Sequence, residues 1–322
     1  MEALLDAAAE VRCVVVGDLM LDRYVTGSVH RISPEAPVPV VRVEAESATV
    51  GGAANVAHNA VALGASCALV GVVGDDAGGM RLKRKLDALG VVTRGVIVSH
   101  DRPTTVKTRV MARQHQIVRF DHEMDVDVAA PLADALCAVV RDLAADADVL
   151  VIEDYNKGVV VPPVIAAVLG AARARGIPVV VDPKRLRFFA FAGATVFKPN
   201  AKELADALGE PIRVDDPAWM EAVRTRVGCE HLLLTLGEHG MALHGADGES
   251  VRVPAAARSV YDVSGAGDTV TAVLALMLGA RATAVEAAII ANHAAALEVA
   301  KAGVATVSRD EILHHYRAFQ AR

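Results

Sequence analysis

The amino-acid sequence predicts a three-layer α/β/α domain with a mainly parallel central sheet and a small inserted β-sheet lid. Two observations support this prediction. Along most of the 322 residues, short apolar runs alternate with helical segments, and each apolar run ends in polar residues. Residues 24–50 and 96–123 break that alternation, because they have strand patterns without an intervening helix.

The composition excludes several classes of protein. The chain is 53% hydrophobic but only 3% aromatic, which suits closely packed helices on a buried sheet. A net charge of −6, with scattered basic residues, argues against nucleic-acid or membrane-surface binding. The four cysteines form no C-x-x-C pair, so neither a zinc site nor a disulfide framework is implied. Without a basic leader or a long uncharged apolar run, we expect a soluble cytoplasmic protein.

The first strand is expected at Cys13–Gly17, and polar residues follow it. Ligands of open parallel sheets bind beyond the carboxyl ends of the strands, so Asp22 is a candidate binding residue; a solvated loop acid is the alternative. A glycine pair, Gly51 and Gly52, then leads into a helix and allows close backbone approach to a ligand. Asn55 could bind a sugar hydroxyl, although a helix start packed tightly on a strand explains the glycines equally well.

The two irregular segments are expected to pair as the lid. In residues 24–50, three prolines precede or interrupt an extended edge strand, Val38–Val43. In residues 96–123, two alternating runs meet at a short turn, Ala112–His115, as in a β-hairpin. Such a two-piece β unit could cover a binding site.

The remaining elements alternate regularly, with each strand ending at the same edge of the sheet. Strands are expected at 67–73, 148–152, 178–182, 194–197 and 231–235, and helices at 80–89 and 131–144. No G-x-G-x-x-G follows the first strand, which argues against a dinucleotide-dependent oxidoreductase.

The clearest functional motif lies near the C-terminus. Gly265, Ala266 and Gly267 let the backbone turn tightly and present unpaired N–H groups where an apolar helix begins. With the helix dipole, such a start binds anions. Asp268 would lie beside a bound phosphate and could accept a proton from an attacking hydroxyl. Alternatively, an acid in the first turn only stabilises the helix.

Oxygen ligands and cations follow other strands at the same edge. Asn200 and Glu203, three residues apart on one helix, could hold a hydrated Mg²⁺ against nucleotide phosphates. Lys157 and Lys184 add positive charge. A nucleotide, a metal and a proton acceptor at one edge describe phosphoryl transfer.

From Val14 to its C-terminal helix, the chain resembles the ribokinase-like carbohydrate kinases. The marks are the Gly-Gly pair within Gly51–Asn55 and the Asp-x-x-Gly-Ala-Gly-Asp motif, Asp262–Asp268. The resemblance implies one kinase domain over residues 1–322, with ATP and Mg²⁺ as cofactors. It also implies that the following residues bind the nucleotide or its metal: Asn200, Glu203, Thr235, Gly237 and Gly240.

Within this family, four segments look most like D-glycero-β-D-manno-heptose-7-phosphate kinases: Gly17–Tyr24, Arg31–Pro39, Glu153–Gly158 and Val181–Lys184. That similarity implies phosphorylation of the anomeric hydroxyl to the 1,7-bisphosphate, a step toward the ADP-heptose of lipopolysaccharide. Many such kinases are fused to an adenylyltransferase. Because the chain ends at Arg322, we expect the stand-alone kinase.

The resemblance also assigns roles. Asp268 would take the proton of the C1 hydroxyl, and the N–H groups of residues 265–268 would stabilise the transferred group. The candidates for binding the substrate are Asp22, Gly51, Gly52, Asn55, Arg113, Asp154, Lys157 and Lys184. Three of these, Lys184, Lys157 and Arg113, are candidates for its phosphate; for Arg113 an exposed turn is the alternative.

Other interpretations remain open at this stage. A phosphofructokinase-like or ribokinase-like sugar kinase would share the fold, and a non-catalytic sugar-binding regulator would be expected to lack Asp268 or its glycines. A nucleoside kinase is less favoured because the lid has few aromatics. The expected partners are a sugar phosphate and ATP, with no nucleic acid and no membrane. The apolar lid residues Val38, Val40, Ile117 and Val118 suggest a homodimer through the lid.

Overall fold

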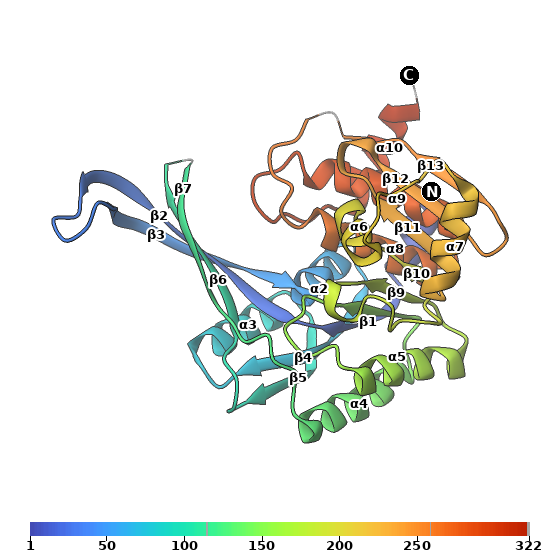
Figure 1. The fold of residues 1–322 in the computed structure, drawn as a ribbon, viewed down its shortest axis with the longest axis horizontal. Coiled ribbons are helices and arrows are strands. Elements are labelled where there is room, and N and C mark those ends of the chain that lie inside the picture. The colour runs from blue at the N-terminus through green and yellow to red at the C-terminus, as the bar shows by residue number, and fades with distance from the viewer. Residues whose placement is uncertain (114, 258, 321–322) are drawn as a thin grey trace.

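The computed structural model describes residues 1–113, 115–257 and 259–320. It contains a nine-stranded sheet in the order β13-β12-β11-β10-β9-β8-β1-β4-β5 (Figure 1). All neighbouring pairs are parallel except β11–β12 and β12–β13. The strands are β1 (Arg12–Gly17), β4 (Ser66–Gly74), β5 (Val92–Ser99), β8 (Val149–Glu153), β9 (Val179–Asp182), β10 (Val196–Phe197), β11 (His231–Thr235), β12 (Met241–Gly245) and β13 (Ser250–Val253). The predicted α/β class and mainly parallel sheet are confirmed.

Helices cover both faces of this sheet. They are α1 (Glu2–Ala8), α2 (Ala53–Ala62), α3 (Ala77–Ala88), α4 (Ala130–Ala144), α5 (Pro162–Arg175), α6 (Ala201–Leu208), α7 (Pro217–Val227), α8 (Ala266–Gly279), α9 (Ala284–Glu298) and α10 (Arg309–Gln320), with 3₁₀ turns at Arg185–Arg187 and Gly237–His239. Strand β1 shows why two layers form: Val15 packs into the core with α2, α8 and α9, and Val14 and Val16 into the core with α4 and α5.

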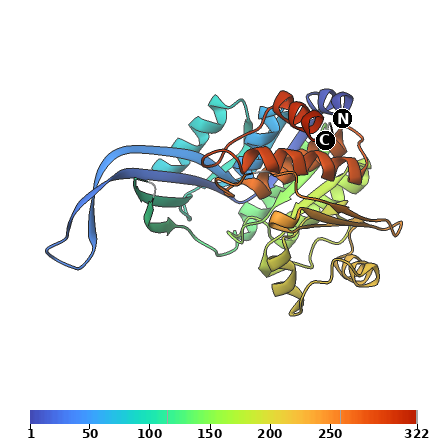
Figure 2. The same cartoon turned by 90° about the horizontal axis from the view of Figure 1, so that it is seen from above.

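A second, four-stranded sheet, here called the lid, has the order β3-β2-β6-β7. Its strands are β2 (Leu19–Ile32), β3 (Pro39–Gly52), β6 (Thr105–Ala112) and β7 (His115–His122). Figures 1 and 2 show its long arm of β2 and β3 reaching away from the main domain. Both of these strands extend past residues 24–50, and residues 96–99 lie in β5 of the large sheet.

The expected lid turn is shorter in the structure, because Ala112 and His115 already belong to strands. Residue 114, within that expected turn, lies outside the described residues. Strand β3 lies at an edge of the lid, as its prolines predict. Within the described residues, no helix is both long and apolar enough to cross a membrane.

Candidate active site

Asp268 lies in the first turn of α8, buried, with only 5% of its surface exposed. Asn55 Nδ2 donates to one of its carboxylate oxygens at 2.7 Å, and the hydroxyl of Tyr155 donates to the other at 2.8 Å. Burial raises the pKa of Asp268 to about 6, against the opposing effect of these two hydrogen bonds. Near neutral pH the carboxylate is therefore mostly ionised and its orientation is fixed by both donors.

The backbone preceding Asp268 adopts the tight turn expected from its sequence. Gly265 caps α8 with φ +95°, a left-handed conformation that favours glycine. A Cβ there would lie 3.1 Å from Asn55 Nδ2 and 3.3 Å from Glu298 Oε1. The N–H groups at the start of α8 thus stand beside Asp268, where they can receive an anion.

A cluster of buried charged side chains lies under this turn, and sequence reasoning gave none of its members a role. Lys198 is only 3% exposed and pairs with Asp182 at 2.8 Å. Burial and the neighbouring Asp182 and Asp268 hold the pKa of Glu153 well above its usual range. A Cβ on Gly267 would lie 3.9 Å from both Lys198 Nζ and Asp182 Oδ2. A buried cation therefore lies close to the turn.

Tyr155 reaches Asp268 because hydrogen bonds to Asp18 fix the loop after β8. The buried carboxylate of Asp18 accepts the backbone N–H groups of Tyr155 at 2.8 Å, Lys157 at 2.9 Å and Val159 at 3.1 Å. The tyrosine ring also faces two ammonium groups: Lys184 Nζ lies 5.0 Å from its centroid and Lys107 Nζ 5.3 Å. The role of Tyr155 was missed, although its segment was among those that suggested the family.

Asn200 and Glu203 have a local structural role as well as a possible ligand role. They form a capping box at the start of α6, with Asn200 Oδ1 accepting the Glu203 N–H at 2.8 Å and Glu203 Oε2 accepting the Asn200 N–H at 2.9 Å. Glu203 Oε1 also pairs with Lys184. No cluster of three metal-ligating side chains occurs among the described residues. One carboxylate and one amide oxygen still fit Mg²⁺, which keeps most of its waters.

One group of the predicted substrate residues has buried or paired side chains: Asp22, Asp154 and Lys157. Asp22 lies at the base of the lid beside Gly51, where a Cβ would collide with the Asp22 carboxylate, and it pairs with Arg109. Asp154 is buried, one of its oxygens has no hydrogen-bond partner, and burial raises its pKa to about 6. Lys157 Nζ pairs with Glu123 at 2.7 Å.

The other predicted residues lie at or just beyond the ends of helices and strands: Arg113, Gly52, Thr235, Gly237 and Gly240. Arg113 is exposed in the lid turn with φ +54°. Gly52 caps α2 with φ +58°. Thr235 ends β11 and bridges to Asn200, so the turn carrying Gly237 and Gly240 lies beside the start of α6.

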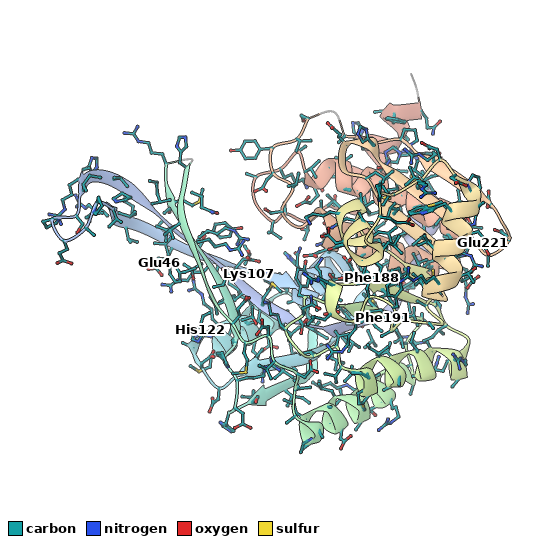
Figure 3. All side chains as sticks on the ribbon, viewed as in Figure 1. Glu46, Lys107, His122, Phe188, Phe191 and Glu221 are labelled. Carbon is teal, nitrogen blue, oxygen red and sulfur yellow. The ribbon has the colours of Figure 1, made fainter. Side chains whose placement is uncertain are left out.

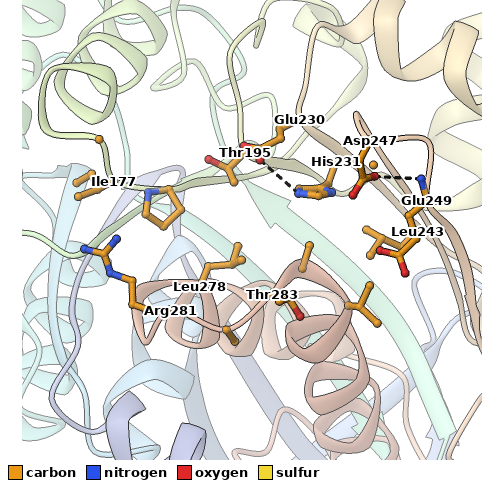
Figure 4. Close-up of a pocket in the computed structure, with 16 residues that line it drawn as sticks. Ile177, Thr195, Glu230, His231, Leu243, Asp247, Glu249, Leu278, Arg281 and Thr283 are labelled. Atoms are coloured by element: carbon orange, nitrogen blue, oxygen red, sulfur yellow. Dashed lines mark hydrogen bonds and ion pairs between the residues drawn. The ribbon is translucent and has the colours of Figure 1, made fainter.

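A separate cavity of about 640 Å³ opens at the opposite edge of the large sheet (Figure 4). Thr195 and His231, which line it, precede or begin strands β10 and β11. None of the predicted site residues lines it. The carboxyl edge of the sheet, around Asp268, remains the candidate active site.

Comparison with known proteins gives one family. Residues 11–311 match the family described as pfkB family carbohydrate kinase. A relative from Azorhizobium caulinodans, "Bifunctional protein HldE", is 49% identical over 302 residues, which cover 92% of this chain and 63% of that protein. The protein of the same name from Gluconobacter oxydans is 46% identical over 304 residues, 94% of this chain and 63% of that one. The chain thus spans less than two thirds of the length of these relatives.

Solved structures share the fold at low sequence identity. Phosphofructokinase-2 from Escherichia coli, solved in complex with potassium, is 21% identical, with a TM-score of 0.79 over 97% of this chain and 100% of that one. Arabidopsis thaliana ribokinase, solved with ribose and ATP, is 22% identical, with a TM-score of 0.74 over 95% of this chain and 98% of that one.

Proposed function

We propose that this chain, which belongs to the pfkB family of carbohydrate kinases, transfers a phosphoryl group to a sugar hydroxyl, and that the sugar is D-glycero-β-D-manno-heptose 7-phosphate. The product would be the 1,7-bisphosphate, with ATP as the phosphoryl donor. The observation that carries the kinase chemistry is the buried carboxylate of Asp268 beside a helix start that can bind an anion. The segments that resemble heptose-7-phosphate kinases support the choice of sugar.

The proposed mechanism uses this chain's own groups. Asp268 accepts the proton of the anomeric hydroxyl as that oxygen attacks the γ-phosphorus. Asn55 and Tyr155 keep the carboxylate oriented through their hydrogen bonds of 2.7 and 2.8 Å. The N–H groups at the start of α8, with the nearby charge of Lys198, stabilise the charge that develops on the transferred group.

The remaining site residues would position the two substrates. Thr235, Gly237 and Gly240 would contact the nucleotide. Asp22, Gly51 and Gly52 at the base of the lid, together with Asp154, would contact sugar hydroxyls. Asn200 and Glu203 would hold a hydrated Mg²⁺, which compensates phosphate charge when bound.

The lid supports a homodimer as part of the proposal. Val38, Val118 and Phe120 are 51%, 49% and 54% exposed. Exposed apolar side chains on a lid are a surface that a second copy could bury. Val118→Asp is expected to convert a dimer into a monomer in sedimentation experiments; a wild-type monomer would contradict the dimer. The four free thiols agree with a reducing cytoplasm as the compartment.

The experiment that tests the function is ATP turnover with Mg²⁺ against three sugars: the heptose 7-phosphate, fructose 6-phosphate and ribose. We expect clear preference for the heptose phosphate, with ³¹P NMR showing the new phosphate on the anomeric carbon. Preference for fructose 6-phosphate would support the phosphofructokinase-like alternative. Binding without turnover of any of the three would support the sugar-binding regulator instead.

A further inference from the structure

The lid carries a lysine to which the proposed mechanism gives no role. Lys107 lies in β6, in register with Asp22 on β2 and Asp121 on β7, so the three share one face of the lid. That face is directed at the active site, because Lys107 Nζ stands 5.3 Å from the centroid of the Tyr155 ring. Figure 3 labels Lys107 on the part of the lid nearer the main domain. We propose that Lys107 binds the phosphate group of the sugar substrate and so makes the enzyme select phosphorylated sugars.

Four other cations around the site are already paired with carboxylates, which separates Lys107 from them. The pairs are Arg109 with Asp22, Lys157 with Glu123, Lys184 with Glu203 and Lys198 with Asp182. No ion pair joins Lys107 to another side chain in the part of the chain that the structure describes. The more distant carboxylates of Asp22, Glu123 and Asp121 offset only part of the cost of burying this ammonium, since burial still lowers its pKa. An anion bound directly to it would stabilise the charge further.

Lys107 and the proposed base are both in contact with Tyr155. Tyr155 connects the two ends of the site: its hydroxyl bonds to Asp268 at 2.8 Å, and the face of its ring meets Lys107. The hydroxyl to be phosphorylated must reach Asp268, whereas the phosphate already on the sugar lies at the far end of the molecule. Lys107 and Asp268 thus contact different parts of Tyr155, just as the distal phosphate and the attacking hydroxyl lie at different ends of the sugar.

The surrounding charges make this end of the site selective. Burial lowers the pKa of Lys107, while Asp22, Glu123 and Asp121 oppose that effect and Lys157 adds to it. A neutral sugar hydroxyl would bring no negative charge to the lysine, whereas a phosphate dianion would. Since Lys107 stands on a lid strand, phosphate binding would also hold the lid over the sugar.

The test measures binding rather than turnover and rests on the proposed function only for the choice of sugar. The protein carries Asp268→Asn to prevent reaction, and calorimetry with MgATP present measures the heptose 7-phosphate and the same heptose without phosphate. Lys107→Met is expected to weaken binding of the phosphorylated sugar by roughly 10- to 100-fold. Binding of the unphosphorylated sugar should change by less than about twofold. Lys107→Arg should retain most of the preference.

Arg42→Met is the matched control, because Arg42 is an exposed cation on lid strand β3. It should alter neither affinity. Equal weakening of both sugars by Lys107→Met, or an unchanged preference for the phosphorylated one, would overturn the role of Lys107. The role of Lys107 would also be overturned if a sugar carboxylate such as gluconate bound more tightly than the phosphorylated sugar. If fructose 6-phosphate replaces the heptose phosphate as the substrate, the proposed sugar fails, and the same comparison with fructose tests Lys107 independently.

Discussion

Tyr155→Phe tests how the site tunes Asp268, the proposed proton acceptor. The substitution keeps the ring between Lys107 and Lys184 but removes the hydroxyl that donates to Asp268 at 2.8 Å. A hydrogen bond to a charged group contributes about 1.5–3 kcal/mol, and one pKa unit corresponds to about 1.4 kcal/mol. Burial already raises the pKa of Asp268 to about 6, and losing this donor raises it further.

Because the base must be ionised to accept a proton, activity falls as the pH drops through its pKa. We expect the acid limb of the kcat/KM profile to move upward by roughly 1–2 pH units, with a two- to tenfold loss at pH 7 and little loss at pH 9. The assay is the pH dependence of kcat/KM for the sugar phosphate. Tyr24→Phe is the control, since Tyr24 lies in the lid beside Arg109. An acid limb that stays in place, or moves downward, would refute the reasoning.

Three further predictions concern stability, each measured by urea unfolding. Lys198→Met leaves Asp182 buried without its partner and should lower the free energy of unfolding by about 3–5 kcal/mol. Adding Asp182→Asn should recover much of this loss, whereas additive losses from the two substitutions would contradict the pairing. Gly265→Ala should destabilise more than Gly176→Ala, because both have positive φ but only Gly265 has neighbours within contact distance; equal losses would argue against crowding. Burial raises the pKa of Glu298 to about 8, whereas the unfolded carboxyl titrates near 4.3, so wild type should lose stability from about pH 5 to 8. Glu298→Gln should lose less over this range, because only the other buried carboxyls still contribute; parallel pH profiles would disprove it.

The sequence predicts structure that depends on adjacent residues, but not contacts between residues that are far apart in the chain and meet only in the fold. The turn at Gly265 and the position of Asp268 in the first turn follow from adjacent residues. The contact of Asn55 with Asp268 joins residues 213 positions apart, so the sequence indicated a helix start at Asn55 but not its partner. Lys198 follows a strand as a charged residue normally would at a surface, and only the packing of β9 beside β10 places Asp182 against it.

The lid shows the same limit. Alternating residues predicted its strands, but the register between β2 and β6 decides which side chains meet, and that register depends on pairing of segments far apart in the chain. For this reason Arg109 and Lys107, within a predicted strand, received no role from the sequence. Arg113 was a candidate instead because the substrate phosphate needs a cation, with an exposed turn as the alternative.

In the proposed mechanism, Asp268 accepts the proton of the attacking hydroxyl. The most direct measurement compares Asp268→Asn with wild type for both turnover and calorimetric binding of the sugar phosphate. Asp154→Asn, which changes another buried carboxyl near the site, is measured in the same way for comparison. We expect kcat of Asp268→Asn to fall by roughly 10²- to 10⁴-fold while binding changes less than about threefold. A kcat within about tenfold of wild type, with binding intact, would contradict it.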